Sequence, residues 1–329
     1  MASIVPVGIA GTGHYLPERV VPNSWFETFL DTSDEWIVQR TGIRERRYAA
    51  DDEATSDLAV NASLKACEAA SIDPKDLDAI ILGTLTPDFQ LPSTAVRVQD
   101  KLGAHNAMAF DVASACTGFV NSVQVGEALI AAGRAKRVLT IGVEVLSRYL
   151  DYENRGSCIL FGDGAGAAVL APHADCGQGE LLRHTMGAKG SDYALIQIPG
   201  GGSVRPPTAE MLNDREHYIH LEGRGVYRFA VSKMSELIGE MLEGIDRDEL
   251  SLIVPHQVNQ RIIDAALERV DLDHSKVMIN IDRYANTSAA TVPIALDEAV
   301  REGRIEKGKY VILVAFGAGV TWGASLLRW

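Results

Sequence analysis

A single cysteine, Cys116, lies among small residues in the segment Asp111–Phe119, directly before the apolar run Phe119–Ile130. The apolar side chains of that run recur at helical spacing, which places Cys116 at or near the N-terminus of a helix. Unpaired backbone N–H groups and the positive end of the helix dipole favour thiolate over thiol there. We therefore expect a nucleophilic cysteine with a pKa well below the ordinary value of about 8.5, although a lone cysteine more often only fills space.

Two further polar residues follow predicted buried strands. His256 comes directly after the strand predicted at Leu252–Val254, and Asn286 follows the strand predicted at Val277–Ile281. Because ligands gather at the carboxyl ends of strands in open α/β sheets, we expect both side chains to meet Cys116 there. Cysteine can hold an acyl group while an imidazole and a carboxamide donate hydrogen bonds to a developing oxyanion, so this set suits thioester chemistry.

The elements that must position these residues alternate between strand and helix, which is typical of an α/β fold with a mixed or parallel sheet. Helices are predicted over 32–40 (with a capping box at its start), 55–70 and 93–102, and strands over 5–10, 78–82, 107–111 and 138–143. We interpret Gly11–Gly13 as a turn, Gly42–Arg47 as a positively charged loop, and the Gly- and Pro-rich segment 174–222 as loop and hairpin over the core.

An internal repeat with an offset of about 170 residues runs through the chain. The order strand, helix, strand and Cys116 recurs as strand, helix, strand and Asn286, and a Gly-rich strand closes each copy. This indicates a duplicated α/β unit in which Cys116 and Asn286 occupy equivalent positions. We predict two halves: residues 1–171, which carry the cysteine, and residues 172–329, which carry the histidine and the asparagine.

Composition limits the class of function. The chain has 329 residues and a formal net charge of -13, which argues against nucleic acid as the main partner. No apolar run approaches the ~18 residues of a membrane span, and a signal-peptide pattern is missing, so we expect no membrane association. The four cysteines have neither metal-ligand nor disulfide-scaffold spacing, which predicts a cytoplasmic protein without a metal site.

A set of motifs that spans nearly the whole chain closely resembles the β-ketoacyl-[acyl carrier protein] synthase III family. The motifs are Asp31–Val38, Arg40–Arg46, Ala115–Phe119, Phe161–Ala168, Pro255–Asn259, Asn286–Ala290 and Phe316–Gly323. The resemblance implies a thiolase-like α/β fold, with duplicated halves whose mixed sheets pack in αβαβα layers, in agreement with the repeat. It also implies an acyltransferase and condensing enzyme that initiates fatty acid biosynthesis.

The same resemblance implies the catalytic roles. Cys116 is acylated by an acyl-CoA primer, and His256 and Asn286 bind the thioester carbonyl of malonyl-[acyl carrier protein]. They stabilise the enolate that forms as carbon dioxide leaves, and this carbanion attacks the acyl group on Cys116 to give 3-oxoacyl-[acyl carrier protein]. The backbone N–H groups of Cys116 and Ala318 form the implied oxyanion hole. Acyl-CoA is a substrate, and no cofactor is implied.

For coenzyme A, the resemblance places Trp36 and Arg155 on the two faces of the adenine, with Arg40 and Thr41 nearby. Cation–π and stacking forces suit the adenine, and a guanidinium suits phosphate.

For the carrier protein, Arg228, Arg261 and Arg269 align with the family's docking patch, but Glu268 stands where the family often has lysine, which weakens the predicted docking. Leu91 aligns with a position at which acetyl-selective relatives hold a phenylalanine that reaches into the partner subunit's acyl pocket. The resemblance therefore implies a homodimer, and the smaller leucine predicts tolerance of primers longer than acetyl.

Other functions stay open at this point. Gly162–Ala167 formally fits a dinucleotide-binding motif, but that motif needs a following helix, and Ala168–Pro172 is strand-like. A thiolase would need a second catalytic cysteine within Phe316–Gly323, and elongating synthases use two histidines. A condensing enzyme of polyketide or quinolone metabolism would keep the same three residues and join other acyl groups. A non-condensing acyl-CoA-binding relative would lack turnover, against which the intact Cys–His–Asn set argues.

Overall fold

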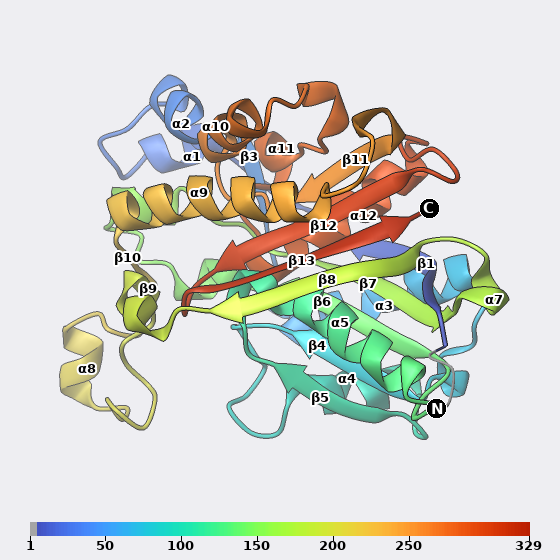
Figure 1. The fold of residues 1–329 in the computed structure, drawn as a ribbon. Helices are drawn as coiled ribbons and strands as arrows, with labels where there is room; N and C mark the ends of the chain where they lie inside the picture. Colours follow the sequence, from blue (N-terminus) through green and yellow to red (C-terminus); the bar gives the residue numbers. More distant parts are fainter. Residues whose placement is uncertain (1–4) are drawn as a thin grey trace.

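The computed structural model describes residues 5–329, which form two mixed β-sheets with helices outside and between them (Figure 1). The first sheet has the order β1-β7-β6-β4-β5. Its strands are β1 (Val7–Tyr15), β7 (Gly164–Pro172), β6 (Val138–Glu144), β4 (Ala79–Gly83) and β5 (Met108–Val112). Strand β7 is antiparallel to both of its neighbours, whereas β4 is parallel to β6 and to β5.

The second sheet has the order β11-β12-β13-β8. Its strands are β11 (Leu250–Pro255), β12 (Tyr310–Gly317), β13 (Thr321–Arg328) and β8 (Glu180–Ala188). Strands β11 and β12 are parallel, and the other two pairs are antiparallel. Each strand of the second sheet thus occupies the same place as one strand of the first sheet. The counterpart of β5 is reduced to a single parallel bridge between Ile253 and Val277.

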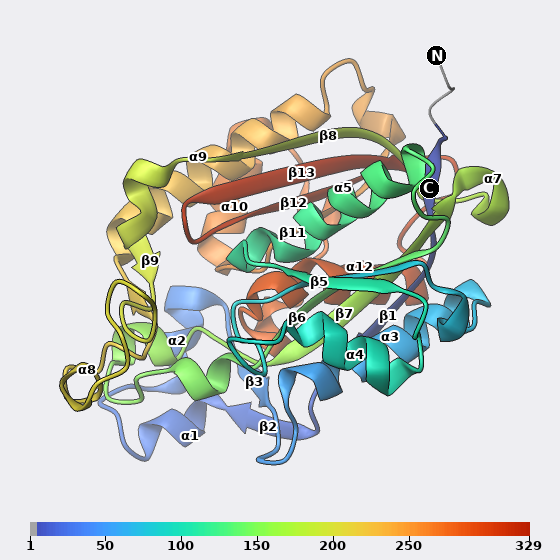
Figure 2. The ribbon, with the colours of Figure 1, turned by 90° about the horizontal axis from the view of Figure 1, so that it is seen from below.

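The helices complete five layers (Figure 2). Helices α3 (Thr55–Ala70) and α4 (Thr94–Leu102) cover the outside of the first sheet, and α9 (Gly223–Met241) and α10 (Gln260–Val270) cover the outside of the second. Between the sheets lie α5 (Gly118–Ala131) and α12 (Thr291–Arg301), whose apolar side chains share one buried core with both sheets. The predicted αβαβα fold of duplicated halves is therefore confirmed.

The remaining helices and strands are short and connect the elements of the five layers. They are β2 (Arg19–Pro22), α1 (Asn23–Glu27), α2 (Asp34–Thr41), β3 (Glu45–Tyr48), η1 (Pro74–Asp76), η2 (Ala115–Thr117), η3 (Leu146–Tyr149), α6 (Arg155–Cys158), α7 (His173–Cys176), η4 (Gly190–Leu195), β9 (Ile196–Gln197), α8 (Ala209–Asn213), β10 (His220–Leu221), η5 (Arg247–Glu249), η6 (His274–Lys276), α11 (Ile281–Tyr284) and η7 (Ser288–Ala290). Within residues 5–329, no helix is long and apolar enough to cross a membrane.

Three predictions about glycines and strands are wrong. Gly11 and Gly13 lie inside β1 rather than in a turn, and a Cβ on either would meet the backbone of α3 at 2.4 Å. Glycine is needed there because the helix packs directly on the strand. The predicted strand Val277–Ile281 is reduced to the bridge at Val277, and α11 begins at Ile281. The segment 174–222 contains β8, a full strand of the second sheet, besides the short β9–β10 pair.

The expected charged loop Gly42–Arg47 is also wrong, because residues 45–48 form β3. Arg46 is fully buried and donates to the backbone carbonyls of Val21 and Ile159 and to the Asn23 side chain. The helix expected at 32–40 is confirmed as α2, although its N-cap is Ser33, whose hydroxyl accepts from the N–H of Trp36.

Gly164 opens strand β7 rather than a helix, which excludes the dinucleotide-binding alternative. The division at residues 171 and 172 stays a prediction.

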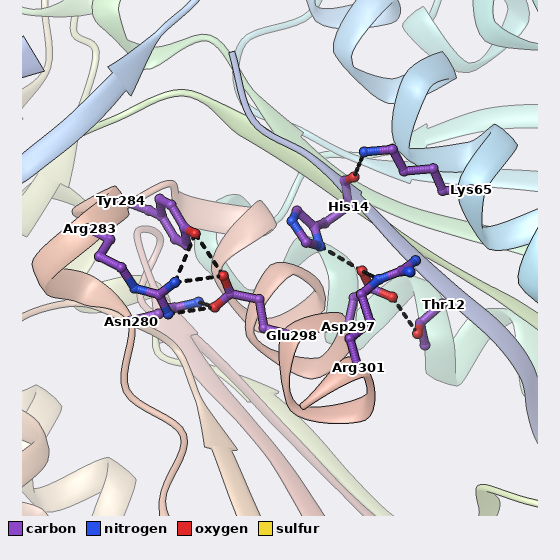
Figure 3. Close-up of polar contacts among 9 residues, drawn as sticks. All are labelled: Thr12, His14, Lys65, Asn280, Arg283, Tyr284, Asp297, Glu298 and Arg301. Atoms are coloured by element: carbon purple, nitrogen blue, oxygen red, sulfur yellow. Dashed lines mark hydrogen bonds and ion pairs between the residues drawn. The ribbon is translucent and has the colours of Figure 1, made fainter. Parts of the chain in front are cut away.

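Two neighbouring carboxylates fix the central helix α12 (Figure 3). Asp297 accepts hydrogen bonds from Thr12 Oγ1 at 2.7 Å, from His14 Nδ1 at 2.6 Å and from Arg301 Nε at 2.7 Å. Burial alone would raise the pKa of Asp297, but these donors outweigh it and hold the pKa below its ordinary value. Since Thr12 and His14 belong to β1, Asp297 ties α12 to the first sheet.

Glu298 forms the second anchor of α12. It accepts from Asn280 Nδ2 at 2.8 Å, from Tyr284 Oη at 2.7 Å and from both terminal nitrogens of Arg283 at 3.0 and 3.1 Å (Figure 3). These donors lie on or next to α11, which ends two residues before Asn286. The two anchors therefore fix both the helix and the segment that leads into it.

Candidate active site

A cavity of about 510 Å³ contains all three of the side chains that were expected to meet, Cys116, His256 and Asn286. Its walls are mainly apolar and come from both halves of the chain. They include Leu85, Leu146, Ile159, Ile196, Phe229 and Phe316. An apolar cavity with a few convergent polar groups is the usual form of a small-molecule site.

Cys116 lies in η2, at the entry to α5, as the sequence predicts. The first residue of α5 packs directly against the end of β4, since a Cβ on Gly83 would meet the backbone of Gly118 at 2.4 Å. The expected low pKa is wrong for this state of the site. Burial raises the pKa of Cys116 to about 11, and the donors around the sulfur, including the N–H groups of Cys116 and Ala318, only partly offset it.

His256 follows β11 and is 1% exposed. Its backbone N–H donates to the carbonyl of Val314 at 2.7 Å, and its Nδ1 lies 2.7 Å from Thr291 Oγ1. The ring also packs edge-on against Phe316, with 5.7 Å between centroids. Burial lowers the pKa of His256 to about 3, so the imidazole is neutral at physiological pH.

Asn286 follows α11 rather than a strand, yet its position is firmly held. Its backbone N–H donates to the carbonyl of Leu160 at 3.0 Å, and its own carbonyl accepts from the N–H of Gly162 at 3.1 Å. The side-chain Oδ1 accepts from the N–H of Ser288 at 2.8 Å. This bond fixes the orientation of the amide and leaves Nδ2 as the free donor of a side chain that lines the cavity.

Left-handed backbone conformations cluster at the site. Ala115, which precedes Cys116, has φ +47°, and Ala285, which precedes Asn286, has φ +57°. Ser288 has φ +49°. Non-glycine residues rarely adopt such angles, and strain of this kind concentrates where surrounding structure holds functional side chains in place. The matching strain before Cys116 and Asn286 agrees with their equivalent places in the repeat.

Glu144 does not line the cavity but is hydrogen-bonded to Leu85, which does, and the sequence did not identify it. It ends β6, is 0% exposed, and accepts hydrogen bonds from Thr84 Oγ1 at 3.0 Å and from Thr86 Oγ1 at 2.7 Å. The N–H groups of Leu85 and Thr86 also donate to it, at 3.1 Å each to Oε2. Burial nevertheless raises the pKa of Glu144 to about 7. A lone acid at the end of the apolar run Val138–Val143 is the signal that could have identified it.

The residues expected to bind coenzyme A gather at the mouth of the cavity. Trp36, Arg40 and Thr41 line it, and Arg155 stacks on the Trp36 ring with its guanidinium carbon 4.7 Å from the centroid. The Arg40 guanidinium lies 5.4 Å from the same ring. The Thr41 hydroxyl donates to the carbonyl of Ile37 at 2.7 Å, within α2.

The residues expected to contact protein partners lie farther apart. Arg261 lines the cavity mouth, whereas Arg228 on α9 and Arg269 on α10 are exposed on the surface outside it. Glu268 is also exposed, next to Arg269. Leu91 does not line the cavity of its own chain and is 86% exposed.

Two family models match the chain. The model of 3-oxoacyl-[acyl-carrier-protein (ACP)] synthase III covers residues 110–190, and the model of the C-terminal part of this family covers residues 242–329. The β-ketoacyl-[acyl-carrier-protein] synthase III of Clostridioides difficile is 49% identical over 324 residues, which are 98% of each chain. The protein of the same description from Caldanaerobacter subterraneus is 46% identical over 331 residues, covering 100% of this chain and 99% of the relative.

Solved structures give the same picture. The 3-oxoacyl-[acyl-carrier-protein] synthase III from Aquifex aeolicus matches with a TM-score of 0.90 and 43% identity, over 98% of this chain and 100% of that one. The priming β-ketosynthase from the R1128 polyketide biosynthetic pathway matches with a TM-score of 0.90 at 32% identity, over 100% of this chain and 98% of that one.

Proposed function

The chain belongs to the 3-oxoacyl-[acyl-carrier-protein] synthase III family, and from this premise we propose how the residues of its cavity perform the reaction. It is an acyltransferase that condenses an acyl-CoA with malonyl-[acyl carrier protein] and so initiates fatty acid synthesis. The identity is higher to these synthases than to the polyketide priming enzyme, which favours fatty acid synthesis over secondary metabolism.

In the first half-reaction, Cys116 Sγ attacks the thioester carbonyl of the acyl-CoA. A sulfur–carbon bond to the enzyme forms, and the bond to coenzyme A breaks. The backbone N–H groups of Cys116 and Ala318 stabilise the oxyanion. Both N–H groups lower the pKa of the Cys116 thiol, so they lie close to its sulfur. A Cβ on Gly317 would lie 2.9 Å from that sulfur, which shows how closely the loop carrying Ala318 approaches it.

In the second half-reaction, His256 and Asn286 bind the thioester carbonyl of the malonyl group. As carbon dioxide leaves, the electron pair of the broken bond becomes an enolate, whose oxygen accepts hydrogen bonds from His256 Nε2 and Asn286 Nδ2. The enolate carbon attacks the acyl carbonyl, a carbon–carbon bond forms, and Cys116 is released. Two neutral donors that are fixed in a dry cavity suit a charge that develops only during the reaction.

The observation that carries this proposal is the meeting of one thiol, one neutral imidazole and one oriented carboxamide in a single apolar cavity. Mass spectrometry of the intact protein after incubation with acyl-CoA tests it. Cys116→Ala should acquire no acyl adduct, whereas Cys158→Ala, the loss of another buried free thiol, should acquire it as the wild type does. His256→Ala should acylate but fail to condense. An adduct on Cys116→Ala would refute the assignment of the nucleophile.

For coenzyme A, we propose that the adenine enters between Trp36 and Arg155 and that Arg40 neutralises phosphate charge. The stacked pair and the nearby guanidinium support this proposal. Thr41 is the last residue of α2, and its hydroxyl already donates a hydrogen bond within that helix. We therefore assign it a role in shaping the cavity mouth rather than in binding phosphate.

For the carrier protein, Arg228, Arg261 and Arg269 form the docking surface around the cavity mouth. A chain of net charge -13 needs such a local patch to attract an acidic partner. Glu268 opposes that attraction, so the docking should be weaker than with lysine at this position and should decrease with added salt.

We also propose a homodimer formed at the edge strand β5, which within residues 5–329 pairs only with β4. Four apolar side chains near this edge are exposed: Phe89, Leu91, Val96 and Met108. An unpaired edge with an apolar patch is a natural interface for a second copy. Leu91 would then reach the acyl pocket of the partner, which would leave room for primers longer than acetyl.

A further inference from the structure

Acylation requires the proton of the Cys116 thiol to leave, but the resting site holds that proton firmly. Burial raises the pKa of this thiol to about 11, so a negligible fraction is thiolate at neutral pH. His256 is a poor proton acceptor, because burial lowers its pKa to about 3. Another group near the sulfur must therefore accept the proton.

Within residues 5–329, Glu144 is a carboxylate whose charge contributes to the raised pKa of the Cys116 thiol. Its four hydrogen-bond donors, two hydroxyls and two backbone N–H groups of residues 84–86, stabilise the ionised form despite complete burial. The established half-reactions give this acid no role. A fully buried acid with a raised pKa beside a nucleophile is a strong functional candidate.

Ser288 connects the two groups. It lies in η7, which packs against both η2, the segment of Cys116, and β6, the strand of Glu144. Ser288 and Cys116 line the same cavity, and the Ser288 hydroxyl lowers the pKa of Cys116 and the pKa of Glu144. Ser288 is 1% exposed, and within residues 5–329 its Oγ has no partner at standard hydrogen-bond geometry. A buried hydroxyl without a fixed partner is free to turn from one neighbour to the other.

We propose that Ser288 and Glu144 form a proton relay that deprotonates Cys116 during acylation, an inference that rests on the proposed role of Cys116 as the nucleophile. The Ser288 hydroxyl gives its proton to the Glu144 carboxylate and takes the proton of the thiol. The sulfur then bonds to the acyl carbonyl as the thioester bond to coenzyme A breaks. The proton held by Glu144 returns through Ser288 to the leaving sulfur, so coenzyme A departs as a thiol.

The relay explains how a buried thiol ionises beside a carboxylate. If Cys116 simply lost its proton to water, two negative charges would face each other in a low-dielectric cavity. Transfer to Glu144 instead moves one negative charge from oxygen to sulfur, and the charge of the site stays constant. Within residues 5–329, Tyr149 is a further titratable group that Glu144 affects: burial and Glu144 raise its pKa above the ordinary value of 10.0, so it stays neutral at physiological pH.

The pH dependence of acylation, measured by rapid quench and mass spectrometry, tests the relay. The wild type should show a rising limb centred near pH 7, where Glu144 loses its own proton. In Glu144→Gln and Ser288→Ala this limb should disappear, and the rate at pH 7.5 should fall by about 10²- to 10⁴-fold, the usual contribution of general base catalysis. Both variants should recover rate towards pH 10, where hydroxide removes the thiol proton.

Two controls separate the relay from a structural effect. Ser288→Ala removes a hydroxyl that makes no standard hydrogen bond, so the fold should be unchanged. Glu298→Gln removes another buried carboxylate, at the far end of α12, and should keep the limb near pH 7. Enzyme acylated at pH 10 and returned to pH 7 should then condense with malonyl carrier at the wild-type rate in both relay variants.

Retention of the wild-type limb and rate by Glu144→Gln and Ser288→Ala would overturn the relay. An equal loss of acylation and of condensation by the preloaded enzyme would overturn it too, because that pattern indicates a structural role. An acyl adduct on Cys116→Ala would instead refute the proposed nucleophile, so the two failures are distinguishable.

Discussion

Replacing Trp36 by alanine should weaken the binding of acyl-CoA without slowing the chemistry. Trp36 lies on α2 at the mouth of the cavity, half-buried, with the Arg155 guanidinium 4.7 Å from its ring centroid. Because the guanidinium already occupies one face of the ring, an entering adenine has to replace that contact with its own. The variant therefore measures the difference between the two contacts.

The magnitude follows from these two terms. Stacking of a base on an aromatic side chain contributes ~1–3 kcal/mol. The displaced cation–π contact at an exposed site contributes ~0.5–1 kcal/mol. The net stabilisation of bound acyl-CoA by Trp36 is then ~0–2.5 kcal/mol, with a midpoint of ~1.25 kcal/mol, which corresponds to an increase in KM of about 8-fold at the midpoint and of at most about 70-fold, while kcat should be unchanged.

Steady-state kinetics with acyl-CoA and with the corresponding acyl-pantetheine provide the assay. The shorter thioester lacks the adenine, so Trp36→Ala should have the same KM for it as the wild type. Thermal unfolding of the variant checks that α2 stays folded. A similar rise in KM with both substrates would refute the stacking role, because it would show that the loss lies in the shape of the mouth and not in contact with the nucleotide.

Three other changes give separate expectations. Thr291→Val removes the hydroxyl that lies 2.7 Å from His256 Nδ1 and helps to orient the imidazole; condensation should fall by about a hundredfold, with acylation unchanged in the intact-mass assay. Asp297→Asn should cost ~3 kcal/mol of stability at pH 7 in urea unfolding. Because the folded pKa of Asp297 is lowered, the contribution of its charge to stability is present above its ordinary pKa of 3.8 and is lost as pH falls through the folded pKa, so the difference between variant and wild type should decrease as the pH falls below 3.8. Leu91→Phe should reduce the rate of acylation by octanoyl-CoA relative to acetyl-CoA by about tenfold or more; a sharp acetyl preference in the wild type would contradict the expected primer range.

The sequence predicts those parts of the molecule that local rhythm and repetition determine. The order of strands and helices, the entry of Cys116 into a helix, and the equivalence of Cys116 and Asn286 all follow from spacing along the chain. The structure confirms the fold even where the second copy has diverged. The counterpart of β5 in the second sheet is reduced to the single bridge at Val277. Asn286 nevertheless lies just before a central helix, as Cys116 does.

What the sequence did not predict depends on burial by distant segments. Nothing local distinguishes Arg46 from its exposed neighbours, and it is buried because residues 21–23 and 159 supply its acceptors. The pKa of Cys116 was predicted in the wrong direction for the same reason. Helix N–H groups are visible in the sequence, but the apolar cavity that desolvates the sulfur is built from both halves. Glu144 was missed because only folding brings it next to the thiol.

The neutrality of the acylated site matters for the second half-reaction. Malonyl carrier brings its own carboxylate into the cavity, and a permanent thiolate beside it would repel that charge at low dielectric. With the sulfur acylated and His256 uncharged, the groups that malonyl meets are neutral donors. An apolar wall around a carboxylate favours loss of carbon dioxide, because the charge then moves to an oxygen that faces two hydrogen-bond donors. Acylation thus removes any charge that the sulfur could carry, which makes the site compatible with decarboxylation in the same space.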